Sequence, residues 1–197
     1  MNYLFISAHT DDAEFGAGAT ISRLVEEGNT INVIAFSYCG NKELKDEMRM
    51  SCNKLGVNGV ILAMNNKVRL FSEVRQGILE VMIGIKKDID IDTVFTFSKH
   101  DIHQDHKVIY EETLRAFKHK TIYGYSFPQN CFSFSSDSFF KVEKKHLDNK
   151  IKALQQYKSQ RYRLYMSPEF IKSNAIYRGL QAGCKYAECF EVIRQII

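Results

Sequence analysis

The feature that most constrains the fold of this 197-residue chain is a repeated alternation of short apolar runs with segments of helical periodicity. Short continuous apolar runs are typical of strands buried on both faces of a sheet. These runs occupy residues 3–6, 30–36, 60–62 and 92–97. Between them apolar residues recur every three or four positions, as in Ala17, Ile21 and Leu24. Because strands and helices alternate over short connections, we predict an α/β, Rossmann-like fold, with a mostly parallel sheet and helices on both faces.

The length and composition of the chain favour one domain over residues 1–197. Hydrophobic residues make up 45% and charged residues 25% of the chain, which supports one well-buried core but not two. After Lys120 the alternation loosens into a Phe- and Ser-rich stretch at 132–140, a lysine-rich helix at about 144–157 and a last strand within 185–197. We expect this C-terminal third, about 121–197, to complete the substrate pocket.

Charge and cysteine usage exclude several classes of protein. The net charge of +4 includes no run of five like charges, which argues against nucleic-acid binding but permits an anionic substrate. No Cys-x-x-Cys pair occurs among the cysteines, and their odd number argues against a disulfide framework. They are Cys39, Cys52, Cys131, Cys184 and Cys189. No signal-like segment and no apolar run of about 18 residues is present, so we predict a cytoplasmic protein without a membrane span.

Two clusters of histidine and aspartate each follow a predicted strand. Residues 7–14 read Ser-Ala-His-Thr-Asp-Asp-Ala-Glu, and residues 100–106 read His-Asp-Ile-His-Gln-Asp-His. The carboxyl ends of strands in an open α/β sheet converge on one crevice. We therefore expect the two clusters to form one metal site.

Three residues of these clusters form a suitable ligand set for a catalytic zinc ion. His9 and Asp12 are three positions apart, so one helical turn points both side chains to the same side. Adding His106 gives two imidazoles and one carboxylate, and leaves a fourth position for a water molecule. The same set also suits Fe²⁺, as in non-haem iron enzymes, although those usually have β-barrel folds and no such strand pattern occurs here.

The remaining residues of the clusters suggest hydrolysis of an amide. Asp11 lies between two ligands and is free to act as general base on the metal-bound water, whose pKa zinc lowers to about 7. His103 could stabilise an oxyanion and protonate a leaving amine. Asp105 could hold His103 or orient a ligand imidazole, and the sequence does not decide between these roles.

Each of these patterns has a structural alternative. A single His-x-x-Asp is more often a helix cap than a metal site, and it is the second cluster that favours the metal. His100 and Asp101 are expected to support the site or shape its loop, and His119 and His146 to lie at the surface. The Gly16-x-Gly18 pair lacks the third glycine of a dinucleotide-binding loop, because position 21 is Ile, so close helix packing is the better explanation.

The two clusters closely resemble the motifs of one enzyme family. Residues 8–20 are similar to the Ala-His-Pro-Asp-Asp-Glu signature, with its glycine-rich continuation, of the PIG-L/LmbE family of zinc-dependent N-acetylglucosaminyl deacetylases. Residues 101–106 resemble its second motif, His-x-Asp-His. Glu47, residues 157–160 and residues 186–190 also look like family features. The resemblance implies a Rossmann-like fold and the same ligands, base and acid as the spacing suggests.

Two departures from the family pattern bear on the substrate. Thr10 replaces the usual proline without removing a ligand, and Leu44 stands where an arginine is often found. Lys45 or Arg49 could substitute for that arginine in substrate binding. Tyr125 and Asn130 follow a predicted strand end and could line the pocket.

The sequence therefore predicts a zinc-dependent hydrolase that deacetylates an N-acetylated amino sugar or its conjugate. The alternatives are a catalytically inactive sugar-binding protein of the same fold and a non-haem iron enzyme. The resemblance makes a homo-oligomer plausible, whereas the group attached to the sugar is not specified by the sequence.

Overall fold

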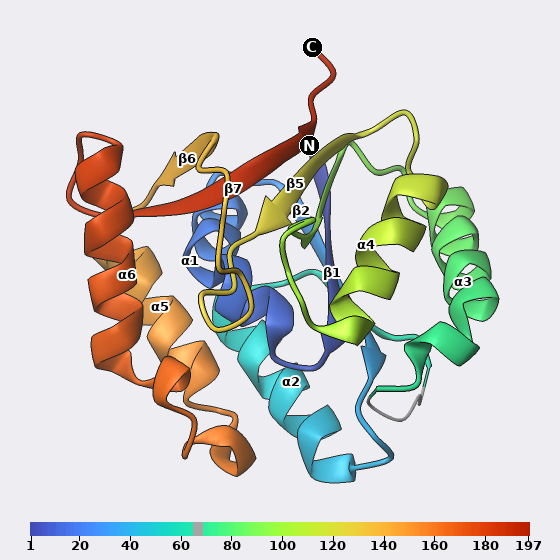
Figure 1. The fold of residues 1–197 in the computed structure, drawn as a ribbon. Helices are drawn as coiled ribbons and strands as arrows, with labels where there is room; N and C mark the ends of the chain where they lie inside the picture. The colour runs from blue at the N-terminus through green and yellow to red at the C-terminus, as the bar shows by residue number, and fades with distance from the viewer. Residues whose placement is uncertain (65–68) are drawn as a thin grey trace.

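A computed structural model describes residues 1–64 and 69–197, and this part of the chain contains one seven-stranded sheet (Figure 1). The strand order is β3-β2-β1-β4-β5-β7-β6. Strands β1 to β5 pair in parallel, whereas β7 is antiparallel to both of its neighbours. The strands are β1 (Asn2–His9), β2 (Thr30–Ser37), β3 (Gly59–Leu62), β4 (Thr93–Phe97), β5 (Thr121–Tyr125), β6 (Ser138–Lys141) and β7 (Ala187–Arg194).

Helices cover both faces of this sheet. Figure 1 shows α3 and α4 together on one side, and α1, α2, α5 and α6 on the other. The helices are α1 (Asp12–Glu26), α2 (Lys42–Leu55), α3 (Arg75–Asp88), α4 (Gln104–Ala116), α5 (Lys144–Leu154) and α6 (Pro168–Gln181). Three single-turn 3₁₀ helices are η1 (Phe71–Glu73), η2 (Lys158–Gln160) and η3 (Leu164–Met166). The predicted α/β fold, with a mostly parallel sheet and helices on both faces, is confirmed.

The local reasons for these elements are those that the sequence indicates. Strand β4 is buried along its whole length, as expected of an apolar strand covered on both faces. Helix α2 ends at Gly56, whose φ of 76° is left-handed and suits glycine. Helix α6 begins with Ser167 as N-cap and Pro168 as its first residue, both favoured residue types at these positions. After Lys120, where the alternation of apolar runs and helical periods weakens, the structure contains a fifth parallel strand, β5, and the short strand β6.

The order in which strands are added to the sheet reverses at two central parallel strands, β1 and β4. From β1 the chain proceeds outward to β2 and β3, and then returns through α3 to β4 on the other side of β1. This arrangement makes the carboxyl ends of β1 and β4 a topological switch point, where open α/β sheets leave a crevice for ligands. Both histidine and aspartate clusters follow these two strands.

Helix α1 is kinked and packed unusually closely. Ala17 departs from helical geometry, with φ of −144° and ψ of 17°. A Cβ atom at Gly16 would lie 2.8 Å from the Tyr125 ring, and one at Gly18 would lie 2.8 Å from the Lys150 side chain. Close packing, rather than a dinucleotide site, thus explains both glycines.

The carboxylate of Glu188 in β7 restores hydrogen bonds beyond the kink. It accepts them from the backbone N–H of Thr20 at 2.6 Å and of Ala19 at 3.3 Å. Lys150 on α5 neutralises the same carboxylate at 2.5 Å, and both side chains are buried. The last strand and α5 therefore hold the helix that begins at Asp12.

Three further predictions can be compared with the described residues. All five cysteines are free thiols. Among residues 1–64 and 69–197, every helix is too short or too polar to cross a lipid bilayer. His119 is exposed as predicted, but His146 is buried, because its Nδ1 accepts the backbone N–H of Glu143 at the start of α5 and its other nitrogen contacts Glu26.

Candidate metal centre and its pocket

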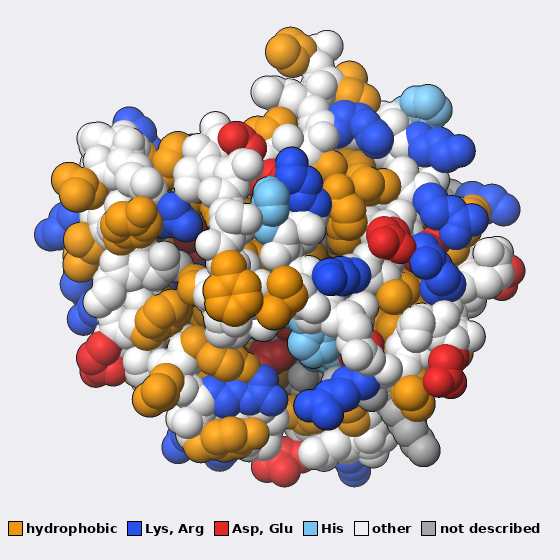
Figure 2. Space-filling model, viewed as in Figure 1, with side chains coloured by type: hydrophobic (Ala, Val, Ile, Leu, Met, Phe, Trp, Pro, Cys, Tyr) orange, Lys and Arg blue, Asp and Glu red, His pale blue; other side chains and the backbone are white. Residues whose placement is uncertain are grey.

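A pocket of about 390 Å³ opens at the carboxyl ends of β1 and β4. Figure 2 looks toward it: acidic and histidine side chains are visible inside the hollow, with Lys and Arg side chains on both sides of it. Its volume lies within the range of small-molecule sites. Predicted residues that line the pocket are His9, Asp11, Asp12, His103, His106 and Asn130.

The ends of secondary-structure elements position these side chains. His9 is the last residue of β1, Asp12 is the first of α1, and His106 lies in the first turn of α4. The Ser7 hydroxyl accepts the backbone N–H of Ala13 at 3.0 Å. It thus provides a hydrogen-bond acceptor for the first turn of α1, a role that a capping aspartate would otherwise have. The clusters therefore meet because two helices begin beside the switch point.

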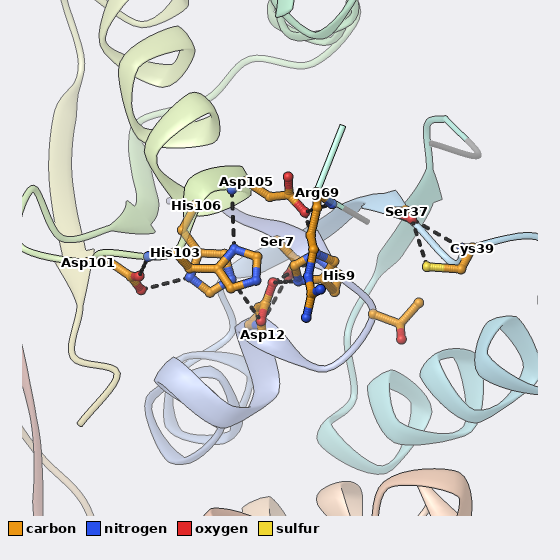
Figure 3. A network of polar contacts seen from close by, with 12 residues as sticks. Ser7, His9, Asp12, Ser37, Cys39, Arg69, Asp101, His103, Asp105 and His106 are labelled. Carbon is orange, nitrogen blue, oxygen red and sulfur yellow. Dashed lines mark hydrogen bonds and ion pairs between the residues drawn. The ribbon is translucent and has the colours of Figure 1, made fainter. Parts of the chain in front are cut away.

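His9, Asp12 and His106 converge as a possible metal-binding set (Figure 3). Their candidate ligand atoms all lie within 4.8 Å of one another. Asp12 is central: its Oδ2 lies 3.5 Å from His9 Nδ1, and its Oδ1 lies 3.7 Å from His106 Nε2. Asp12 Oδ2 also accepts the backbone N–H of His9 at 2.7 Å, which fixes the carboxylate between the two rings.

A second carboxylate holds the far nitrogen of each histidine. Asp105 Oδ2 lies 3.1 Å from His9 Nε2, and Asp101 Oδ2 lies 2.7 Å from His106 Nδ1. The other ring nitrogens, His9 Nδ1 and His106 Nε2, face Asp12. Carboxylate–histidine pairs of this kind orient metal-binding imidazoles and raise their basicity. The donor set and its supports therefore fit a divalent metal ion.

The structure resolves the role that the sequence left open for Asp105. Its side chain bonds His9, whereas His103 accepts the backbone N–H of Asp105 at 3.2 Å and caps α4. Asp105 Oδ2 also accepts the backbone N–H of Arg69 at 2.7 Å. His9, His103 and Asp105 form a second group within metal-binding reach, but both contacts engage Asp105 Oδ2, and its Oδ1 is buried without a hydrogen-bond partner among the described residues.

Burial and charge set the ionisation of the site. Burial alone would lower the pKa of His9, but hydrogen bonds to Asp105 and Asp12 raise this pKa to about 10. Although burial opposes it, the charge of His106 and the contacts of His9 lower the pKa of Asp12 to about 2. Burial, followed by repulsion from His106 and His9, lowers the pKa of His103.

Asp11 differs from Asp12 in both contacts and ionisation. It occupies the N-cap position of α1, yet its side chain makes no capping hydrogen bond. Burial and the neighbouring charge of Asp12 raise the pKa of Asp11, and Arg163 counteracts part of this increase. A carboxylate with a raised pKa is a stronger proton acceptor, and Asp11 lines the pocket.

The structure separates the four residues that the sequence nominates for substrate binding. Asn130 lines the pocket, but Lys45 and Arg49 do not belong to its described lining. Tyr125 is fully buried, and its hydroxyl donates to the carbonyl oxygen of Phe95 at 3.2 Å. This ring is a core residue against which Gly16 packs.

Several lining residues have no counterpart in the sequence prediction. They come from loops and from single-turn 3₁₀ helices and are Arg69, Gln160, Arg163 and Tyr165. Residues 157–160 do carry a family-like pattern, and the structure shows its reason. Glu47 on α2 accepts the backbone N–H of Ser159 at 3.0 Å and its hydroxyl at 2.6 Å. Glu47 thereby fixes the segment that leads into Gln160 and Arg163.

The sequence matches the family model of PIG-L, described as GlcNAc-PI de-N-acetylase, over residues 4–117. That range contains every residue of the possible metal-binding set. The chain belongs to the PIG-L family, whose members include deacetylases. Over 173 residues it is 30% identical to the uncharacterized deacetylase YaiS of Escherichia coli (strain K12), covering 79% of this chain and 90% of the relative.

Solved structures share the fold at low sequence identity. The N,N'-diacetylchitobiose deacetylase of Pyrococcus horikoshii has a TM-score of 0.76 and 17% identity, over 98% of this chain and 83% of its own. The 4-carboxy-2-hydroxymuconate hydratase GalB of Pseudomonas putida KT2440 has a TM-score of 0.79 and 18% identity, over 100% of this chain and 97% of its own. One fold thus accommodates deacetylases and a hydratase, so the reaction must be argued from the site.

Proposed function

We propose that this protein is a zinc-dependent hydrolase that removes the acetyl group from an N-acetylated amino sugar or its conjugate. The observation that carries the proposal is that two adjacent aspartates have different surroundings and can therefore have different roles. Asp12 lies between the two histidine rings, whereas Asp11 makes no capping bond and lines the pocket. A binding protein needs no second carboxylate beside its metal, so this arrangement favours a catalyst.

His9, Asp12 and His106 would hold the metal. When bound, a zinc ion supplies Lewis acidity to an amide carbonyl and lowers the pKa of water. Two imidazoles and one carboxylate are a frequent donor set of catalytic zinc. Asp105 and Asp101 keep the two rings in the orientation that such binding requires.

Asp11 and His103 would carry the proton transfers. Asp11 accepts a proton from the attacking water, since it lines the pocket and its raised pKa makes it a better base. His103 lines the same pocket and faces the His106 ring, with ring centroids 4.4 Å apart. From there it can stabilise the developing oxyanion and deliver a proton to the departing amine. The products are acetate and a free amino sugar.

Family membership and two relatives support an amide of an amino sugar as substrate. The matching family model describes a de-N-acetylase that acts on a GlcNAc conjugate. The structure from Pyrococcus horikoshii is a deacetylase of an N-acetylated disaccharide. The pocket is large enough for one sugar ring and a substituent.

The test combines metal analysis with an amine-release screen. The purified protein is assayed for acetate and primary amine with N-acetylglucosamine, N,N'-diacetylchitobiose and N-acetylglucosamine conjugates, before and after chelation. We expect release that chelation abolishes and zinc restores. Activity that returns with Fe²⁺ but not with zinc would favour the iron alternative, and absence of release from every probe would contradict the proposal.

A further inference from the structure

Two arginines that line the pocket form no ion pair with a carboxylate among the described residues. In the described part of the chain, the arginines that form ion pairs with carboxylates are Arg23, Arg75 and Arg115. Arg69 and Arg163, by contrast, line the pocket and belong to no ion pair among the described residues, although the charge of Asp11 acts on Arg163. A guanidinium carries five N–H donors. Arg163 donates to the hydroxyl groups of Tyr165 and Tyr162, which leaves other donors for a ligand.

The backbone of Arg69 is fixed in an unfavourable conformation. Its φ is 72°, a value that residues other than glycine rarely adopt. The N–H of Arg69 donates to Asp105 Oδ2 at 2.7 Å, and its carbonyl oxygen accepts the side-chain amide of Gln104. Figure 3 shows the Arg69 side chain extending from Asp105 toward His9 and Asp12. Strain of this kind persists where neighbouring contacts over-determine the conformation, and it is concentrated at ligand sites.

Arg163 reaches the pocket from a second, independently fixed segment. Glu47 holds Ser159 through two hydrogen bonds, and Tyr165 packs edge-on against the Phe15 ring at 5.2 Å between centroids. The guanidinium of Arg163 lies 5.7 Å from the centroid of the Tyr165 ring. It is half-buried, and a guanidinium held by packing loses less entropy when it binds a ligand.

A neighbouring amide offers an acceptor to the same space. Gln160 lines the pocket, and its Oε1 is buried with no hydrogen-bond partner among the described residues. Its Nε2 donates to the Ser159 hydroxyl at 3.2 Å, so the free oxygen faces away from that contact. An unpaired buried acceptor is costly, and a hydroxyl group of a ligand would satisfy it.

We infer that Arg69 and Arg163 form a subsite for an oxyanion, so that the substrate carries a phosphate or carboxylate group beside its acylated amino sugar. This inference rests on the proposed function and specifies its substrate class. Guanidinium groups bind both anions through paired N–H bonds. Gln160 would accept a hydrogen bond from a hydroxyl of the same ligand, whereas a neutral N-acetylated sugar would offer no anion to either guanidinium group.

The test compares neutral and anionic substrates in matched variants. The neutral probe is N-acetylglucosamine, the phosphate probes are its 1- and 6-phosphates, and the carboxylate probe is N-acetylmuramic acid. We expect the wild type to favour at least one anionic probe by about tenfold or more in kcat/KM, the effect of hydrogen bonds to a charged group. The phosphate and carboxylate arms distinguish the two anions.

The variants separate recognition from structural support. Arg163→Gln and Arg69→Gln should lower kcat/KM for the favoured anionic probe about tenfold more than for the neutral probe, and the difference should appear in KM. Arg163→Lys should retain part of the preference, because it keeps the charge but not the fork. Arg161→Gln is the matched control, since Arg161 is exposed and is not among the described lining residues. Equal losses on both classes of probe, or no anionic preference in the wild type, would overturn the inference.

Binding distinguishes failure of the subsite from failure of the proposed function. If no probe is hydrolysed, calorimetric titration with inorganic phosphate still tests the arginines. Weaker phosphate binding in Arg163→Gln than in Arg161→Gln would support the subsite without any deacetylase activity. Equal phosphate binding by these two variants, or none by the wild type, would refute it.

Discussion

The residues that could hold a metal and three other lining residues, Gln160, Arg163 and Tyr165, come from two differently built regions. The first region ends at α4, and the groups that could hold a metal lie at the ends of β1 and β4 or in the first turns that follow them. The second contains η2, η3 and the antiparallel strands β6 and β7, and it supplies Gln160, Arg163 and Tyr165. In the first region chemistry is placed by short-range geometry. In the second it is placed by contacts between segments more than 100 residues apart.

We propose from this difference that reaction and specificity are carried largely by separable groups of residues. Changes at Asp11 and at the three groups that could hold a metal should alter metal binding or turnover without regard to substrate. Changes in the second should alter stability or substrate choice while the metal remains bound. The four predictions below use matched variants to test that division.

The largest effect is expected from loss of a ligand. His106→Ala removes one of the three groups that would hold the metal, so we expect the protein to bind no zinc and to show no detectable deacetylation. Zinc per chain is measured by mass spectrometry, and circular dichroism checks the fold. His119→Ala, at an exposed position, should bind as much zinc as the wild type. A full complement of zinc in His106→Ala would contradict the ligand assignment.

Loss of the general base should reduce turnover but not metal binding. Asp11→Asn preserves shape and removes the proton acceptor, so kcat should fall by roughly 10²–10⁴-fold with unchanged zinc content. Asp46→Asn, an exposed change on α2, controls for the loss of one negative charge. Retained turnover in Asp11→Asn would assign the base elsewhere.

The third prediction concerns the support of the pocket wall. Glu47→Ala removes two hydrogen bonds to Ser159 from a buried carboxylate, which should cost roughly 3 kcal/mol and lower the Tm by roughly 6–12 °C. Zinc content should not change, but kcat/KM should fall as Arg163 loses its fixed position. Glu43→Ala on the exposed side of α2 should leave both Tm and kcat/KM close to wild type. Equal behaviour of the two variants would remove Glu47 from this role.

The smallest effects are expected from two helical glycines. Gly16→Ala places a Cβ 2.8 Å from the Tyr125 ring and should destabilise the protein by roughly 1–3 kcal/mol. Gly84→Ala on α3 meets nothing within 4 Å and should stabilise it by about 0.5–1 kcal/mol. Urea denaturation measures both differences. Opposite signs would confirm that Gly16 is selected by packing, whereas two stabilising changes would contradict it.

Sequence information predicts the first region far better than the second for a physical reason. The strand and helix periods of residues 3–117 are strong, and the two clusters directly follow strands, so topology alone brings His9 and His106 together. Arg69 and Arg163 lie in segments without periodicity, where no local rule fixes the direction of a side chain. Tyr125 shows the converse error, because its place after a strand suggested a lining residue and packing against Gly16 made it a core residue.

The kink in helix α1 affects the order in which parts of the fold can form during synthesis. The N–H groups of Ala19 and Thr20 donate to the carboxylate of Glu188, which lies 169 and 168 residues later in the sequence. During synthesis the helix that begins at Asp12 therefore leaves the ribosome long before the carboxylate that satisfies its interrupted turn. A chain that ends between residues 106 and 188 contains all three groups of the possible metal-binding set but lacks the carboxylate that bonds to the helix of Asp12.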